Sequence, residues 1–266
     1  MPELPEVETI VRRMRPEIVG RKITVADLRW ERTLATPEPA LFNKNILGQS
    51  VESVNRRAKY IVAQLSVDTL IIHLRMSGDI LFRPTDAPTH KHDRLLLQLD
   101  DEKVLAFNDM RKFGRVWLTP APQDILGKLG PEPLDDAFTP NELFERIHAH
   151  KRQIKPLLLD QHIIAGLGNI YTDEALHLSN LHPLTKSDMI KRKQAKILWR
   201  SIREVLNEGI RRNGTSIDWI YRGGENQYYL NVYGRKDEPC LKCGTPIQKI
   251  VVGQRGTHFC PQCQKL

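Results

Sequence analysis

The chain carries Cys240-Leu241-Lys242-Cys243 and, after sixteen intervening residues, Cys260-Pro261-Gln262-Cys263, and these two stretches contain all four of its cysteines. Two such pairs present four thiolates to one tetrahedral zinc ion and leave no open position for water. The run between them, Gln248–Val252, is rich in β-branched residues and predicts a hairpin clipped by the metal. Two redox pairs or free thiols are the alternatives. The spacing favours one structural Zn²⁺ bound by Cys240, Cys243, Cys260 and Cys263.

The bulk composition bounds the class of protein. With 266 residues, the chain is long enough for two domains that each bury a core. It holds 40 lysines and arginines against 32 aspartates and glutamates, a net charge of +8. This excess favours a polyanionic partner, although a modestly basic enzyme has the same composition. Because no long apolar run or apolar leader is present, we expect a cytoplasmic protein that does not enter a membrane.

The hydrophobic pattern divides the chain into a β-rich part and a helical part. Apolar residues at helical spacing predict a helix over Leu4–Ile18, and short β-rich runs recur between residues 22 and 119. Helical patterns follow at Asn141–His150, from Pro156 and over Ile190–Arg212. We therefore expect a two-domain α+β protein. Its parts are an antiparallel β-sandwich with a flanking helix at residues 1–130, a helical domain at 131–235 and the zinc hairpin at 236–266.

The first residues, Met1-Pro2-Glu3-Leu4-Pro5-Glu6, offer unusual chemistry. Removal of Met1 would leave Pro2 as a terminal secondary amine, which can form an iminium directly and is partly unprotonated at neutral pH. Glu3 supplies a carboxyl group beside that amine for proton transfer. The alternative is structural, with Pro2 and Pro5 starting a helix. If Met1 is retained, Pro2 is an amide and this nucleophile does not exist.

A glycine turn, Gly166-Leu167-Gly168-Asn169, lies in the helical half. Its backbone N–H groups and the Asn169 amide suit a phosphate. The alternative is a tight turn between helices with Asn169 as the helix N-cap. Lys151, Arg152 and Lys155 stand upstream, and they either line the same groove or are ordinary surface charges.

Two loops combine apolar and basic side chains. His73–Gly78 ends a strand and leaves Met76 near the tip of a turn, and Asp109–Gly114 puts Arg111 and Phe113 on the same side of a loop. Apolar wedges with an arginine suit a protein that opens a duplex and fills the vacancy. The alternative places the methionine and phenylalanine in the core and the arginine at the surface.

Two further basic residues stand at turns. Lys59 precedes a strand, where it can bind phosphate or act as an acid. Arg255 lies at the tip of the predicted zinc hairpin. Because the metal would keep that hairpin rigid, Arg255 is a good candidate for a phosphate contact.

Taken together, these segments resemble the formamidopyrimidine-DNA glycosylase family over essentially the whole chain. The matching motifs are MPELPEVE, RRAKY, HLRMSG, DMRKFG, LGPEPL, GLGNIYTDEAL, VYGR and QRGTHFCPQC. The resemblance implies a helix-two-turn-helix domain in the helical half. It also implies removal of oxidised purines such as 8-oxoguanine and formamidopyrimidines, followed by elimination on both sides of the abasic site to leave a one-nucleotide gap.

The resemblance also implies roles for individual residues. Pro2 is the expected nucleophile at the deoxyribose C1′, Glu3 the proton shuttle that helps open the sugar, and Lys59 a phosphate contact that assists elimination. Arg255 is expected to grip phosphates beside the lesion and is counted with these catalytic residues. The expected DNA-binding residues are Glu6, Met76, His92, Arg111, Phe113, Lys151, Arg152, Lys155, Asn169 and Tyr171.

The partner implied is duplex DNA with oxidised bases or abasic sites, bound by a monomer that needs no catalytic metal or organic cofactor and is associated with the nucleoid. One segment, residues 216–229, is shorter than expected for family members that excise 8-oxoguanine. An enzyme of the endonuclease VIII type, specific for oxidised pyrimidines, is therefore one alternative, although Leu4 and the pair Arg111 and Phe113 favour purines. The other is a damage-binding protein without catalysis. Trp219, Tyr228 and Tyr229 can stack on a base or pack on the domain.

Overall fold

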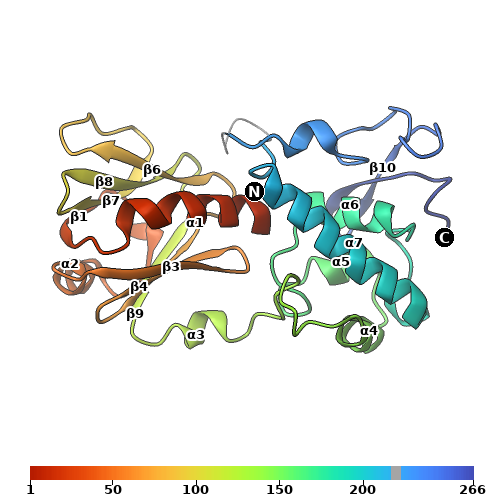
Figure 1. Ribbon diagram of the computed structural model, residues 1–266, viewed down its shortest axis with the longest axis horizontal. Helices are drawn as coiled ribbons and strands as arrows, with labels where there is room; N and C mark the ends of the chain where they lie inside the picture. Colours follow the sequence, from red (N-terminus) through yellow and green to blue (C-terminus); the bar gives the residue numbers. More distant parts are fainter. Residues whose placement is uncertain (217–222) are drawn as a thin grey trace. The chain divides into compact units, whose positions relative to one another are not determined.

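The computed structural model describes residues 1–216 and 223–266, and it divides into two compact units (Figure 1). Among the described residues, the first unit holds residues 1–2, 6–128, 216 and 223. The second holds residues 3–5, 129–215 and 224–266. The predicted two-domain α+β architecture is therefore confirmed, and three residues at the start of the chain group with the C-terminal unit.

The first unit is a sandwich of two sheets. One sheet has four antiparallel strands in the order β1 (Ile23–Leu28), β7 (Asp93–Leu99), β8 (Lys103–Asp109) and β6 (Gly78–Pro84). The other has five strands in the order β2 (Leu34–Thr36), β9 (Arg115–Thr119), β5 (Thr69–His73), β4 (Tyr60–Leu65) and β3 (Val51–Arg57). All neighbours are antiparallel except β2 and β9, which run parallel.

The core of this unit lies between the two sheets and helix α1 (Leu4–Ile18). The helix has the bounds that the apolar spacing predicts, and its face at Val7, Ile10, Val11 and Met14 is buried. Strand residues of both sheets complete the same cluster, among them Ile61, Ile72, Leu97 and Phe107. Three short segments without an assigned place in the prediction surround it: η1 (Glu31–Thr33), α2 (Pro39–Ile46) and α3 (Gln123–Leu126).

Three connections of the sandwich pass from one sheet to the other, β1–β2, β5–β6 and β8–β9, and we call the last two the inter-sheet passages. The chain leaves β5 in the five-stranded sheet and enters β6 in the four-stranded sheet, and it makes the reverse passage from β8 to β9. Gly78 pairs with Asp109, and His73 pairs with Arg115. Both passages therefore run side by side at one end of the sandwich.

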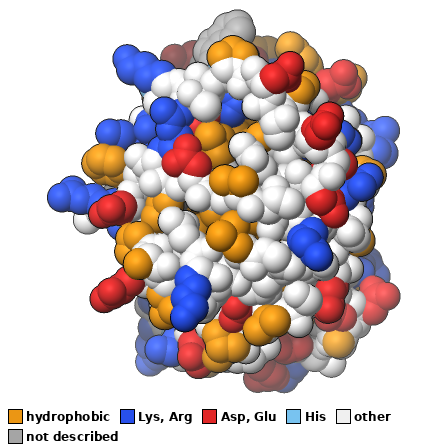
Figure 2. Space-filling model, turned by 90° about the vertical axis from the view of Figure 1, so that its left-hand side faces the viewer, with side chains coloured by type: hydrophobic (Ala, Val, Ile, Leu, Met, Phe, Trp, Pro, Cys, Tyr) orange, Lys and Arg blue, Asp and Glu red, His pale blue; other side chains and the backbone are white. Residues whose placement is uncertain are grey.

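The outer face of this unit in Figure 2 mixes lysine and arginine side chains with aspartate and glutamate side chains and small apolar areas. Surface ion pairs of the unit include Lys103 with Glu17 at 2.6 Å and Arg21 with Asp101 at 3.3 Å. Alternating charge of this kind suits a solvated surface.

The second unit is helical and ends in a hairpin. Its helices are α4 (Pro140–His148), α5 (Ile154–Leu158), α6 (Asn169–Leu178) and α7 (Arg192–Arg211), with single turns η2 (Ser187–Met189) and η3 (Asn226–Tyr229). The hairpin consists of β10 (Gln248–Val252) and β11 (Arg255–Phe259), which pair antiparallel. Among the described residues, every helix is too short or too polar to cross a bilayer.

Local chemistry explains most of these boundaries. Thr139 caps α4 because its hydroxyl accepts the Glu142 N–H at 3.2 Å, and Pro140 takes the first position. The predicted stop of α7 is confirmed, since Asn213 and Gly214 both adopt positive φ. Helix α5 begins two residues before the predicted Pro156, and this is the ordinary uncertainty of a sequence-derived boundary.

Helices α6 and α7 pack closely where α7 carries Gly209. A Cβ atom at this position would lie 2.6 Å from the Tyr171 ring and hydroxyl, so glycine is required for the approach. Tyr171 is fully buried and its hydroxyl lies 3.2 Å from Thr215 Oγ1.

We expect Gly209→Ala to destabilise the protein by about 1–3 kcal/mol, because overpacking at this contact outweighs the better helix propensity of alanine. Urea unfolding measures the difference in free energy. Lys196→Ala, at an exposed position of the same helix, is the control and should change stability by less than about 0.5 kcal/mol. Equal effects of the two substitutions would contradict the packing argument.

Candidate active site

Glu3 is an interior side chain whose carboxylate binds the start of α6. Its Oε2 accepts the Gly168 N–H at 2.7 Å, its Oε1 accepts the Ile170 N–H at 2.8 Å, and a longer bond of 3.4 Å comes from the Tyr171 N–H. Only 2% of Glu3 is exposed. N–H groups in the first turn of a helix have no partner within the helix, and the helix dipole favours an anion there. The carboxylate therefore takes the place of an external anion.

The glycines of this turn make room for the N-terminal segment. A Cβ on Gly168 would lie 2.4 Å from Glu3 Cδ, and one on Gly166 would lie 2.6 Å from Leu4 Cδ1. Gly166 also has φ +91°, and its carbonyl accepts the Leu4 N–H at 3.1 Å. The sequence suggested that these backbone donors hold a phosphate, and the structure shows them holding Glu3.

Pro2 is buried and directly precedes this anchored glutamate. In the full sequence its nitrogen is bonded to Met1, which is 51% exposed. Loss of Met1 would convert that tertiary amide to a secondary amine next to a carboxylate of fixed position.

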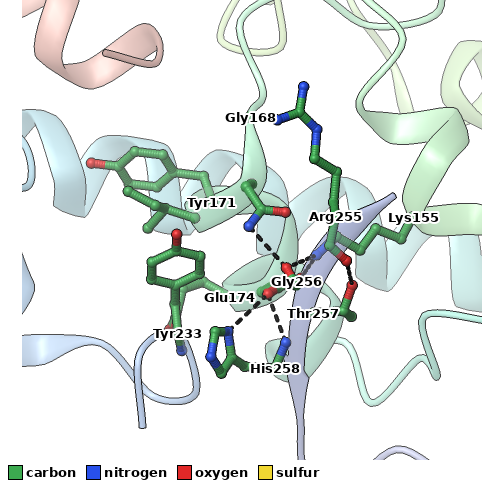
Figure 3. A network of polar contacts seen from close by, with 12 residues as sticks. Lys155, Gly168, Tyr171, Glu174, Tyr233, Arg255, Gly256, Thr257 and His258 are labelled. Carbon is green, nitrogen blue, oxygen red and sulfur yellow. Dashed lines mark hydrogen bonds and ion pairs between the residues drawn. The ribbon is translucent and has the colours of Figure 1, made fainter. Parts of the chain in front are cut away.

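Asn169 is the first residue of α6, and Gly168 is the N-cap without a side-chain cap bond. The alternative in which Asn169 is the helix N-cap is therefore wrong. Its Nδ2 instead donates to the Gly256 carbonyl at 2.9 Å and ties α6 to strand β11 (Figure 3). Arg255, one residue earlier, is exposed at the start of that strand.

A buried ion pair supports the same hairpin (Figure 3). Lys155 Nζ donates to Asp173 Oδ1 at 2.6 Å and to the Gly256 carbonyl at 3.1 Å, and Asp173 Oδ2 accepts the His258 N–H at 2.9 Å. Burial lowers the pKa of Lys155 from its ordinary value, and the Asp173 carboxylate opposes that shift. Lys155 was expected at the DNA, but it is fully buried and binds internal partners.

Glu174 holds the loop that leads to the zinc hairpin. Its two oxygens accept four hydrogen bonds of 2.8–2.9 Å, from the backbone N–H groups of Asn231, Val232 and Tyr233 and from the Asn231 amide. The sequence pattern predicts no role for Asp173 or Glu174. The one sign in the sequence that they are buried anchors is that two acidic residues stand side by side in the segment Asn169–Leu178, among Ile170, Ala175 and Leu176.

The four cysteines converge at the base of the hairpin. Their sulfur atoms all lie within 4.8 Å of one another, and the Cys243–Cys260, Cys243–Cys263 and Cys240–Cys263 pairs are 3.5, 3.5 and 3.9 Å apart. Zn–S bonds of about 2.3 Å in a tetrahedron place sulfur atoms roughly 3.8 Å apart. The donor set and its dimensions therefore fit one structural Zn²⁺, in agreement with the sequence.

The first unit carries the wedge candidates on its two inter-sheet passages. Met76 is 37% exposed and Phe113 is 49% exposed, so the alternative that places them in the core is wrong. The Arg111 guanidinium lies 5.1 Å from the centre of the Phe113 ring. The structure thus groups these three side chains at one end of the sandwich.

The remaining predicted residues of this unit lie in several places. Lys59 is 5% exposed at the turn between β3 and β4, where Ala58 has φ +53°. Glu6 is buried in α1, and His92 is half-buried with its Nδ1 3.3 Å from Arg94 Nη2.

Of the remaining predicted DNA-binding residues of the second unit, two are at the surface and one is buried. Lys151 and Arg152 are exposed, and Arg152 pairs with Asp160 at 3.0 Å. Tyr171 is buried against α7, so it supports the packing of the helices.

A β-sandwich unit, a helical unit and a four-cysteine finger define the class of zinc-finger DNA glycosylases. Three family models match the chain: the formamidopyrimidine-DNA glycosylase N-terminal domain at residues 1–116, the H2TH domain of the same enzymes at 129–220, and a zinc finger found in FPG and IleRS at 237–266. The chain belongs to the formamidopyrimidine-DNA glycosylase family and is a DNA glycosylase. The family resemblance seen in the sequence is confirmed.

Relatives match along the full length. The chain is 43% identical to formamidopyrimidine-DNA glycosylase of Herpetosiphon aurantiacus, with 99% of this chain and 100% of the relative covered. It is 45% identical to that of Protochlamydia amoebophila over 100% of both chains. Among solved structures, MutM in complex with carbocyclic 8-oxo-G containing DNA has a TM-score of 0.93 and 39% identity over 100% of both chains. Lactococcus lactis Fpg bound to DNA containing an AP site has a TM-score of 0.92 and 38% identity, with 99% and 100% covered.

We expect the purified protein to contain one zinc ion per chain and to lose the hairpin when the metal is removed, because ligand binding and local folding are coupled. Metal analysis before and after chelation measures the content, and thermal unfolding measures the loss of stability. Cys260→Ser should reproduce the chelated state. A zinc-free protein with unchanged thermal stability would contradict a structural metal.

Lys155→Met should cost about 3–5 kcal/mol of unfolding free energy, because it leaves the buried Asp173 carboxylate without its cation. The double variant Lys155→Met/Asp173→Asn removes the uncompensated charge and should be more stable than the single variant. Urea unfolding of both, at unchanged zinc content, gives the comparison. A double variant that is no more stable than Lys155→Met would show that the charge is not the cause.

Proposed function

We propose that this chain removes 8-oxoguanine and formamidopyrimidine bases from duplex DNA through a covalent Pro2 intermediate and then cleaves the strand on both sides of the abasic site. Family membership supports the reaction class, and solved relatives carry DNA with 8-oxo-G, an AP site or Fapy-dG. One observation carries the proposal. Glu3, the residue directly after Pro2, has its carboxylate fixed by backbone N–H groups of Gly168 and Ile170.

The chemistry follows from an amine and a carboxyl group in adjacent residues. The Pro2 nitrogen attacks C1′ of an everted nucleotide, and the damaged base leaves with the electron pair of the glycosidic bond. Glu3 passes a proton to the ring oxygen, so that the sugar opens and an iminium forms between Pro2 and C1′. The iminium acidifies the C2′ proton, and loss of that proton expels the 3′ phosphate. The resulting conjugated iminium acidifies the C4′ proton, and loss of this second proton expels the 5′ phosphate. Lys59 assists by binding phosphate.

DNA binding is divided between the two units in this proposal. Eversion of the damaged base costs a few kcal/mol of unstacking and unpairing. Met76, Arg111 and Phe113 enter the duplex and fill the space that the base leaves. Arg255 and Asn169 bind phosphates, the first from a hairpin that zinc keeps rigid. Charge of +8 supports association with a polyanion. The protein acts as a monomer, and the reaction needs no catalytic metal or organic cofactor.

Borohydride trapping on a duplex with one 8-oxoguanine opposite cytosine tests the proposal. We expect Met1-free protein, verified by intact mass, to form a covalent adduct that peptide mapping locates at Pro2. The reason is that borohydride reduces an iminium to a stable amine. Pro2→Leu places a large residue after Met1, so Met1 is retained, the nitrogen of residue 2 is an amide, and no adduct should form at residue 2.

Lys59→Met is the matched control. It leaves the Pro2 amine intact, so it should still be trapped, whereas a lysine Schiff base would disappear. Trapping on thymine glycol but not on 8-oxoguanine would support the pyrimidine-specific alternative. Tight binding of abasic DNA with neither an adduct nor strand cleavage would support a damage-binding protein instead. The short segment at residues 216–229, on which the pyrimidine-specific alternative rests, includes residues 217–222 with Trp219, and these lie outside the described residues.

A further inference from the structure

The two inter-sheet passages of the sandwich meet at a buried carboxylate. Asp109 is the last residue of β8 and has no exposed surface, and Ser77, in the turn before β6, is 6% exposed. The Ser77 hydroxyl donates to Asp109 Oδ1. This bond joins the turn that carries Met76 to the loop that carries Arg111 and Phe113.

The same carboxylate also determines the path of the loop that follows it. Asp109 Oδ2 accepts the Gly114 N–H at 2.7 Å, and Oδ1 accepts the Arg111 N–H at 3.2 Å. The Arg111 N–H lies 3.0 Å from Ser77 Oγ as well. The Asp109 backbone is fixed in turn, because Arg94 Nε donates to its carbonyl at 2.7 Å.

The Met76, Arg111 and Phe113 side chains are exposed, whereas Asp109 and Ser77, which hold their loops, are buried. Gly114 closes the loop against the core, since a Cβ there would lie 2.2 Å from Phe107 Cζ. A buried carboxylate that loses one of its donors bears a large desolvation cost, so the cluster favours a single arrangement of both passages. The exposed Met76, Arg111 and Phe113 are thus mounted on one rigid support.

We infer that Asp109 and Ser77 are positioning residues that lock the two passages together, so that the methionine, arginine and phenylalanine enter DNA as one preorganised set. This inference rests on the proposed function, in which these three side chains fill the space of an everted base. Misplacement of such a set slows eversion of a base, whereas an abasic site has no base to unstack. Substitution of Asp109 or Ser77 should therefore slow the reaction on a duplex with a damaged base more than the reaction on a duplex with an abasic site.

Single-turnover kinetics on two duplexes test this inference. For Ser77→Ala and Asp109→Asn we expect excision of 8-oxoguanine to slow by roughly 10- to 100-fold. Cleavage of a preformed abasic site should stay within about threefold of the unmodified enzyme. Equal losses on both duplexes, or no loss on either in variants that fold, would overturn the inference.

A matched control and a non-catalytic readout complete the design. Asp68→Asn alters another buried carboxylate of the same unit, one that binds Gln49 at the β4–β5 turn, and should affect neither duplex. A 2-aminopurine beside a tetrahydrofuran abasic analogue reports insertion into the base stack without any reaction, and it detects slower insertion even where this step does not limit cleavage of an abasic site. Slower insertion by both variants supports the inference even if 8-oxoguanine proves not to be the substrate. Unchanged insertion kinetics would overturn it.

Discussion

Contacts between buried carboxylates and backbone N–H groups are the constraint on which the helical unit depends. Glu3 binds the first turn of α6, Asp173 binds β11 and Lys155, and Glu174 binds the loop at residues 231–233. Each carboxylate is nearly or fully inaccessible to water, and burial without these donors would be strongly unfavourable. Helix α6 therefore determines at once where Glu3, the zinc hairpin and the loop before the hairpin lie.

The first unit uses the same device in a different setting. Asp109 joins two passages between sheets, and its partners are again a hydroxyl and backbone N–H groups. In both units, buried carboxylates fix the segments that carry the exposed groups proposed to bind DNA. Glu3 differs from the others, because the proposed function also gives it a proton transfer. Apart from Glu3, the carboxylates that fix the geometry are therefore different groups from the exposed apolar and basic side chains proposed to bind the partner.

Sequence predicted the parts of the molecule that carry a regular signal. Helix α1 follows from apolar periodicity, the zinc site from cysteine spacing, and the exposure of Met76 and Phe113 from their place in loops. Asp109, Asp173 and Glu174 could not be predicted as anchors, because their partners are mostly peptide N–H groups, which every residue except proline possesses. For the same reason, the sequence of the glycine turn suggested a phosphate site. The anion that binds its N–H groups is Glu3, which lies more than 160 residues away along the chain.

Hydrogen bonds from backbone N–H groups to buried carboxylates affect which positions of the sequence can be substituted. Ile170, Val232 and Tyr233 contribute only their N–H groups to Glu3 and Glu174, so their side chains can change without loss of these bonds. Proline alone removes the donor outright. Substitution tolerance at such positions is therefore set by packing, while the acidic partner admits almost no replacement. Two chains could differ at many positions around α6 and still share the same anion-centred framework.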